Sequence, residues 1–151
     1  MDRNLDHLYP AFRSKVETVL EGLKDWCTKH APDLVPTVIE TYRPQSRQNA
    51  LYAKGRTAPG PKVTQTLRSR HTEGLAVDIC PFRNKQPVWD HKQFWAYYGH
   101  LCRANGIVWG GDWNSDGIED KFADSPHSEW PAKDDSTRAA ARAWIKGQSW
   151  K

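Results

Sequence analysis

An acidic residue within an apolar strand restricts how this chain can fold. Asp78 lies in the predicted strand Leu75–Ile79, on the same face as Ala76 and Cys80, because side chains alternate along a strand. Burying a bare carboxylate costs free energy, so Asp78 needs a partner inside the fold. A metal ion is one such partner and a Lys or Arg side chain is another. From these residues alone, the ion pair is favoured.

Helix and strand patterns follow one another without a repeated strand–helix–strand unit. Apolar residues recur at helical spacing from Ala11 to His30, and Pro32 ends that helix. Further strands are predicted at Thr37–Tyr42, Ile107–Trp109 and His127–Trp130, and further helices at Ser46–Lys54, Asp90–Asn105 and Asp135–Lys146. A few strands flanked by helices predict the α+β class.

The length of 151 residues favours one domain, residues 1–151, in which residues 134–151 form a C-terminal helical extension. Three cysteines without paired spacing do not predict a disulfide framework. No segment is long and apolar enough to span a membrane, and Met1–Pro10 lacks the apolar core of a signal peptide. We therefore expect a monomer that is made in the cytoplasm without a signal peptide and does not insert stably into membranes.

The formal net charge of +4 favours anionic partners, but a mildly basic soluble protein is the simpler interpretation. There is no nucleic-acid-binding motif and no long Lys/Arg run, so nucleic acid is not an expected partner. The basic tail with Trp144 and Trp150 would suit contact with an anionic envelope surface. Docking of the tail onto the protein through Trp144 and Ile145 is the favoured alternative.

Two histidines accompany acidic residues in a pattern that suits a metal-dependent hydrolase. A catalytic zinc ion takes three protein ligands and keeps one position open for water. His71, Asp78 and His127 would supply two nitrogens and one oxygen, and Asp124 would remain as a base for the water. The same ligands also suit cobalt or manganese. The alternatives are that Asp124 only caps a turn, or that Glu129 is the base.

Four segments resemble one peptidase family. Ser69–Asp78 resembles its S-x-H-x-x-G-x-A-x-D signature, Trp109–Trp113 its W-G-G-D-W run, and Asp124–His127 its acid-x-x-H motif. Glu40–Arg43 with Gln48 resembles its upstream Tyr-Arg and Gln stretch. The family is that of D-alanyl-D-alanine carboxypeptidases and L-alanyl-D-glutamate endopeptidases. It includes VanX-like and VanY-like peptidases and many phage endolysins, and it shares a fold with the hedgehog signalling domain.

This resemblance covers roughly residues 36–130 and implies a small antiparallel sheet flanked by helices. It implies that Asp124 is the general base and then protonates the leaving amine, and that Arg43 polarises the scissile carbonyl or holds a substrate carboxylate. Ser69 is expected to bind substrate. The zinc ligands that it implies are His71, Asp78 and His127. Two tryptophans beside the motifs, Trp113 and Trp130, are expected to line the cleft.

The function implied is that of a zinc metallopeptidase that hydrolyses peptidoglycan stem peptides. A phage endolysin with L-alanyl-D-glutamate endopeptidase activity is favoured, acting on the cell wall after release from the host cytoplasm and causing host cell lysis. The alternatives are a D-alanyl-D-alanine carboxypeptidase or dipeptidase and a non-catalytic zinc-bearing binding module. The chain departs from the family pattern at Pro44 and Ser128, neither of which is a proposed ligand.

An acidic segment that starts at Asp112, inside the Trp109–Trp113 run, begins like a calcium-binding loop. Oxygen-bearing side chains stand at positions one, three and five, followed by Gly117 at six, but Ala123 replaces the usual glutamate at twelve. The candidate calcium ligands are Asp112, Asn114, Asp116 and Asp120. A solvated acidic turn is the alternative, and Asp112 would then support the zinc site.

Overall fold

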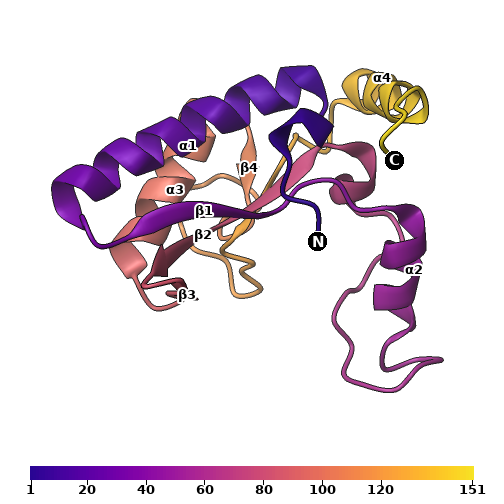
Figure 1. Cartoon of the computed structure of the whole chain (residues 1–151), viewed down its shortest axis with the longest axis horizontal. Coiled ribbons are helices and arrows are strands. Elements are labelled where there is room, and N and C mark those ends of the chain that lie inside the picture. The colour runs from indigo at the N-terminus through magenta and orange to yellow at the C-terminus, as the bar shows by residue number, and fades with distance from the viewer.

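A long amphipathic helix, α1 (Pro10–His30), runs along one side of the molecule (Figure 1). The computed structural model describes all residues, 1–151. Pro10 stands in the first helical turn, where its missing N–H removes no helical hydrogen bond. The buried residues of α1 repeat at helical spacing and form one face. They are Phe12, Val16, Val19, Leu20, Leu23 and Cys27.

Five strands form one antiparallel sheet in the order β1-β2-β5-β4, with β3 paired to the far end of β2. Their bounds are β1 (Val35–Glu40), β2 (Ala76–Arg83), β3 (Gln86–Pro87), β4 (Val108–Trp109) and β5 (His127–Glu129). The central strand β2 is buried along most of its length. Its register places Asp78 opposite Glu40 on one side and opposite His127 on the other.

The remaining helices are α2 (Gln45–Ala53), α3 (Lys92–Ala104) and α4 (Asp135–Lys146), with short 3-10 turns at η1 (Leu5–His7) and η2 (Arg70–Glu73). The cap of α3 is His91, whose ring nitrogen accepts a hydrogen bond from the Phe94 N–H. After α3 the chain turns at Gly106, where φ is 68°, a conformation that glycine adopts without strain.

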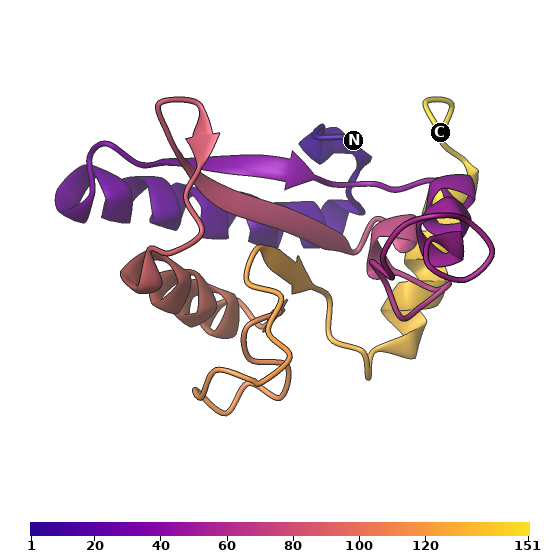
Figure 2. The same cartoon turned by 90° about the horizontal axis from the view of Figure 1, so that it is seen from below.

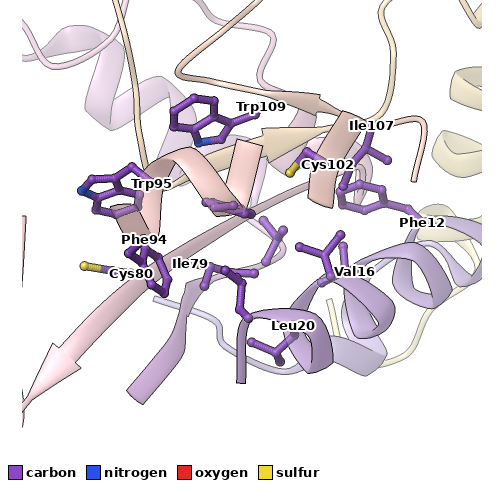
Figure 3. Packing of buried hydrophobic residues seen from close by; sticks show 14 of the residues in the cluster. Phe12, Val16, Leu20, Ile79, Cys80, Phe94, Trp95, Cys102, Ile107 and Trp109 are labelled. Atoms are coloured by element: carbon purple, nitrogen blue, oxygen red, sulfur yellow. The ribbon is translucent and has the colours of Figure 1, made fainter. Parts of the chain in front are cut away.

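The hydrophobic core fills the space between the sheet and the helices α1 and α3 (Figure 3). Apolar side chains from all three elements contact one another there. Among those drawn in Figure 3 are Phe12, Val16, Ile79, Phe94, Trp95, Cys102 and Trp109. All three cysteines are buried and unpaired.

Two long connections leave the sheet at different places. In Figure 1, α2 and the connection after it project from the end near α4. In Figure 2, the loop 110–125 (orange) hangs below the sheet, apart from α2 and its connection at the right. The start of β2 and the strand β5 lie between these two connections. None of the helices combines the length and apolarity needed to cross a membrane.

The predicted α+β class and the small antiparallel sheet are confirmed. Each of the four predicted helices lies within two residues of the observed one. The sheet differs more, because β2 continues beyond Ile79 through Pro81 to Arg83 and pairs there with β1 and β3. The two-residue strand β3 and the 3-10 turns have too few residues to show a periodic pattern, and they were not predicted.

Candidate active site

Three side chains from separate elements meet at the floor of a cleft. His71 comes from η2, Asp78 from β2 and His127 from β5. Asp78 Oδ1 lies 3.3 Å from His71 Nε2 and 3.1 Å from His127 Nδ1. Taken together, one potential ligand atom from each residue lies within 4.8 Å of the other two. The pairing of β2 with β5 thus joins Asp78 and His127, which are 49 residues apart in sequence.

The local structure of η2 fixes the ring of His71. Ser69 caps this turn, since its Oγ accepts a hydrogen bond from the His71 N–H at 3.2 Å, and Gly74 ends it with a φ of 68°. His71 Nδ1 lies 2.6 Å from the carbonyl oxygen of Thr41. Because a carbonyl oxygen only accepts hydrogen bonds, Nδ1 carries the proton. Nε2 therefore presents its lone pair to the cluster.

The ring of His127 is held through Nε2, the nitrogen that faces away from Asp78. Its Nε2 lies 2.8 Å from Glu129 Oε1, and both side chains share one face of β5. Glu129 Oε2 is in turn 3.6 Å from Arg70 Nε. The buried hydroxyl of Tyr98 donates to the carbonyl oxygen of Pro126 at 3.1 Å, which anchors the backbone just before His127.

The cluster stabilises positive charge at the point where its donor atoms meet. Burial disfavours the ionised form of Asp78, but hydrogen bonds with His127 and His71 outweigh this effect and hold its pKa well below its usual range. Burial disfavours the cationic form of His127, but its hydrogen bonds to Asp78 and Glu129 raise its pKa to about 10.

The donor set fits a zinc ion. Two imidazole nitrogens and one carboxylate are the number and type of ligands found in open, catalytic zinc sites. In addition, the second nitrogen of each ring is held by an oxygen atom, of Thr41 for His71 and of Glu129 for His127. Such outer hydrogen bonds are the rule around histidine ligands in metal sites.

A pocket of about 360 Å³ opens above the cluster, with Asp124 at its mouth. The side chain of Asp124 is exposed, yet the protein around it partly desolvates the carboxylate and raises its pKa. The Asp124 N–H donates to the carbonyl oxygen of Gly110 at 2.7 Å. A Cβ atom at Gly110 would overlap the carbonyl oxygen of Asp124, so glycine is required for this close approach.

Two arginines line the same pocket in different settings. Arg43 donates from Nε to Glu40 Oε1 at 3.0 Å and from Nη1 to Gln48 Oε1 at 2.7 Å. Gln48, which is fully buried, also donates to the carbonyl oxygen of Thr66 at 2.6 Å and so ties Arg43 to the connection after α2. Burial disfavours ionisation of Glu40, but the bonds from Arg43 hold its pKa below the usual value. Arg68 lines the same pocket without an ion-pair partner.

Most of the predicted site residues are brought together. The cleft is lined by His71, Asp78, His127, Asp124, Arg43, Ser69 and Trp113. Trp130 is placed elsewhere, because position 130 faces the other side of the strand from His127. Its ring packs against Phe12 and its Nε1–H donates to Asp134. The strand sequence around Asp78 favoured an ion pair with a Lys or Arg side chain. This prediction is wrong, because the partners of Asp78 are two imidazoles.

Two contacts in the site were not predicted from the sequence. Glu129 was considered as a base, but its carboxylate is bound to His127. The spacing of these two residues within a strand, which puts them on one face, was the available signal. Gln48 belongs to the motif that begins at Glu40, and nothing local in the sequence indicates that it joins Arg43 to Thr66.

The acidic loop does not gather its carboxylates into one potential metal-binding group. Asp112 accepts a hydrogen bond from the Asp116 N–H and turns toward Arg103, with Oδ2 3.3 Å from its Nη1. Asp120 accepts from the Trp113 N–H. These carboxylates thus stabilise the loop itself, and Asp112 does not support the histidine cluster. A calcium site formed with Asn114 stays a prediction.

Comparisons with known proteins agree with this geometry. The family model described as D-alanyl-D-alanine carboxypeptidase matches residues 62–130, which include all three cluster residues and Asp124. The peptidoglycan L-alanyl-D-glutamate endopeptidase CwlK of Bacillus subtilis is 31% identical over 120 residues, covering 72% of this chain and 67% of that protein. The chain belongs to the family of D-alanyl-D-alanine carboxypeptidases and L-alanyl-D-glutamate endopeptidases, and it is a hydrolase that acts on cell-wall peptides.

Two further proteins are similar to this chain. The L-alanyl-D-glutamate peptidase of Listeria phage A118 is 28% identical over 117 residues, covering 74% of this chain but only 35% of that protein. The crystal structure of the L-Ala D-Glu endopeptidase ChiX of Serratia marcescens superposes with a TM-score of 0.59 and covers 85% of this chain and 88% of that one. At 23% identity, this second likeness shows the fold.

Proposed function

We propose that this chain is a zinc-dependent endopeptidase that cleaves the L-alanyl-D-glutamate bond of peptidoglycan stem peptides and serves as a phage-type endolysin. The proposal is carried by the convergence of His71, Asp78 and His127 below Asp124 in one cleft. The names of the Bacillus and Listeria phage relatives support the scissile bond, and the phage relative supports the role in lysis. The protein would act on the wall after release from the cell that makes it.

Zinc would be held by His71 Nε2, His127 Nδ1 and the carboxylate of Asp78. Bound there, it would supply Lewis acidity for the scissile carbonyl and make water a stronger nucleophile at neutral pH. Thr41 and Glu129 would keep the two imidazole rings in the orientation that points these nitrogens at the same space.

Asp124 would transfer the proton. The water oxygen bonds to the scissile carbonyl carbon while the Asp124 carboxylate accepts a proton from that water. Asp124 then gives the proton to the amide nitrogen as the carbon–nitrogen bond breaks, which leaves a carboxylic acid on one product and an amine on the other. The acid then passes its proton to the amine, directly or through water, and becomes a carboxylate. The place of Asp124 at the mouth of the pocket, close to His127 through the short 124–127 turn, suits this role.

Arg43 and Ser69 would orient the substrate. Arg43 is held rigidly by Glu40 and Gln48, so its guanidinium is preorganised to bind the scissile carbonyl oxygen or a substrate carboxylate. Ser69 lines the pocket beside His71 and has a hydroxyl proton to donate, because its Oγ acts as an acceptor in capping η2.

The test is digestion of purified peptidoglycan, with the new amino terminus identified by mass spectrometry. We expect amino-terminal D-glutamate to form with zinc, to disappear with a chelator and to return when zinc is added back. Asp124→Asn should lower the rate by about 10²- to 10⁴-fold, the usual contribution of a general base. The variant should still bind zinc, measured by elemental analysis, because Asp124 is not a ligand.

Other outcomes would assign the chain differently. Release of free D-alanine without new amino-terminal D-glutamate would make it a D-alanyl-D-alanine carboxypeptidase. Zinc binding without any cleavage would make it a binding module. Full activity of Asp124→Asn would remove Asp124 from the mechanism.

A further inference from the structure

A second pocket lies on the other side of the loop 110–125. It has a volume of about 490 Å³ and lies between that loop and the start of α3. Three tryptophans contribute to its wall. They are Trp89, Trp95 and Trp109.

The tryptophans form a fixed aromatic surface. Trp95 and Trp109 are nearly buried and stand at the edge of the core (Figure 3). The ring of Trp89 lies parallel to that of Trp95, with 6.3 Å between centroids and 13° between planes, and it is 56% exposed. The Nε1–H of Trp95 donates to the backbone carbonyl oxygen of Trp89 at 2.9 Å, which fixes the backbone of the segment that carries the exposed ring. A large, ordered aromatic face in water is typical of a binding surface.

Polar groups of both signs surround this aromatic surface. Asp90, Lys92 and Glu119 line the pocket and are exposed, and none of them forms an ion pair within the chain. Separate donors and acceptors beside aromatic rings suit a neutral ligand that has hydroxyl and amide groups and an apolar ring face. A sugar ring with an acetamido group has this chemistry.

The second pocket adjoins the catalytic cleft through one stretch of chain. Asp124 lines the cleft and Ser125, the next residue, lines the second pocket. The Nε1–H of Trp109 donates to the carbonyl oxygen of Ser125 at 2.7 Å, so the aromatic wall is bonded directly to the base-bearing turn. The cleft and the second pocket therefore meet at the Asp124–Ser125 segment.

The charges of the cleft indicate which half of the substrate points toward the second pocket. A stem peptide carries its carboxylates from D-glutamate onward, whereas its L-alanine is joined directly to an N-acetylated amino sugar of the glycan strand. The arginines Arg43 and Arg68 line the catalytic cleft, and neither of them lines the second pocket. The anionic half suits the cleft that carries these arginines, which leaves the sugar half toward the second pocket.

Resting on the proposed function, we propose that the pocket of Trp89, Trp95 and Trp109 binds the amino sugar to which the stem peptide is attached. The sugar ring stacks on Trp89, and Asp90, Lys92 and Glu119 bind its polar groups. The enzyme therefore prefers stem peptides that are still joined to the glycan over free peptides.

The test compares two substrates that differ only in the sugar: a disaccharide-linked stem peptide and the same peptide free. The wild type should cleave the sugar-linked substrate with a higher kcat/KM. Trp89→Ala should lower that kcat/KM by about tenfold, mainly through KM, as loss of one stacking contact predicts. Trp89→Phe, which keeps an aromatic face, should recover much of the loss. Phe122→Ala is the matched control, because Phe122 is an 83% exposed aromatic of the loop 110–125 that lines neither pocket.

An equal loss on both substrates in Trp89→Ala would overturn the sugar pocket, since it would reveal a general structural defect. Equal kcat/KM for the two substrates in the wild type would overturn it as well. Failure of the proposed function is separable, because sugar binding needs no cleavage. Titration of the disaccharide-linked peptide into Asp124→Asn, followed by tryptophan fluorescence, should show saturable binding that Trp89→Ala weakens. An unchanged affinity in the variant that combines Asp124→Asn with Trp89→Ala would also refute the proposal that this pocket binds the sugar.

Discussion

At the scale of single residues, Glu129 supports the cluster through His127. Its Oε1 lies 2.8 Å from His127 Nε2, on the opposite side of the ring from Asp78. A carboxylate in this position fixes the tautomer and the orientation of the ring and raises the basicity of the other nitrogen. Arg70 lies beside its second oxygen and limits the movement of the carboxylate.

Glu129→Ala should therefore weaken zinc binding by about 10- to 100-fold, the usual effect of removing such a partner. Glu129→Gln keeps an oxygen acceptor for the Nε2–H of His127 and should retain most of the affinity. The measurement is competition for zinc with a chromophoric chelator, which does not depend on catalysis. An unchanged zinc affinity in Glu129→Ala would mean that His127 needs no support from position 129.

The residues that form the site were largely predictable from the sequence, but several of their contacts were not. The order of the motifs indicated His71, Asp78 and His127 as one group, and they do meet. The strand that contains Asp78 predicts a Lys or Arg partner for it. This prediction fails because the sequence of one strand does not show which residues lie opposite it in the sheet. Trp130 was predicted to line the cleft from its nearness to His127 in sequence, but the alternation of side chains turns it to the other face.

At the scale of elements, α4 stabilises the turn that carries His71. Arg138 of α4 binds both carboxylate oxygens of Glu73 at 2.8 and 3.1 Å, and Glu73 is a buried residue of η2. Ile145 and Ala141 of the same helix are also buried. The start of α4 is capped by Asp134, whose carboxylate accepts hydrogen bonds from the N–H and the hydroxyl of Thr137.

This cap makes the stability of the protein depend on pH in acid. Hydrogen bonds from Thr137 and Trp130 lower the pKa of Asp134 from 3.8 to about 2. A depressed folded-state pKa stabilises the protein above the unfolded-state value, and this contribution declines as the pH falls from about 4 toward 2. Asp134→Ala should lower the melting temperature at pH 6, and its difference from the wild type should shrink below pH 4.

Asp134→Asn is the matched control, because asparagine caps helices about as well as aspartate and does not titrate. It should lose no cap on acidification. Thermal melts of the three proteins from pH 6 to pH 2.5 provide the comparison. A gap between the wild type and Asp134→Ala that stays constant over this range would contradict the assignment of the cap.

Helices were more predictable than strands for a physical reason. A helix buries one face through contacts three and four residues apart, so its periodicity is complete within its own sequence. The end of β2 depends on a neighbour instead. Pro81 has no N–H to donate, yet it lies opposite Pro36 in β1 and still accepts a hydrogen bond from the Val88 N–H through its carbonyl oxygen.

At the scale of the whole molecule, zinc would link η2, β2 and β5, which are brought together only by folding. A ligand that binds the folded chain and not the unfolded one raises the free energy of unfolding, by about 2.7 kcal/mol at 100 times its Kd. For a domain of this size we expect the melting temperature to rise by roughly 5–10 °C with zinc.

His127→Ala should abolish this rise in melting temperature, whereas Asp124→Asn should keep it. Of these two residues, His127 is a proposed zinc ligand and Asp124 is not. Calorimetry with and without zinc measures both. A rise of equal size in His127→Ala would mean that zinc binds elsewhere on the protein.

The sequence by itself determined the helices, the α+β class and the residue types of the site, because periodicity and motif order are properties of short segments. Only the tertiary structure decided that Asp78 stands opposite His127, that Thr41 and Glu129 hold the two rings, and that Trp130 faces away. Strand pairing and register follow from burial of whole faces of the sheet, a free energy summed over distant segments. No short stretch of sequence specifies such a sum.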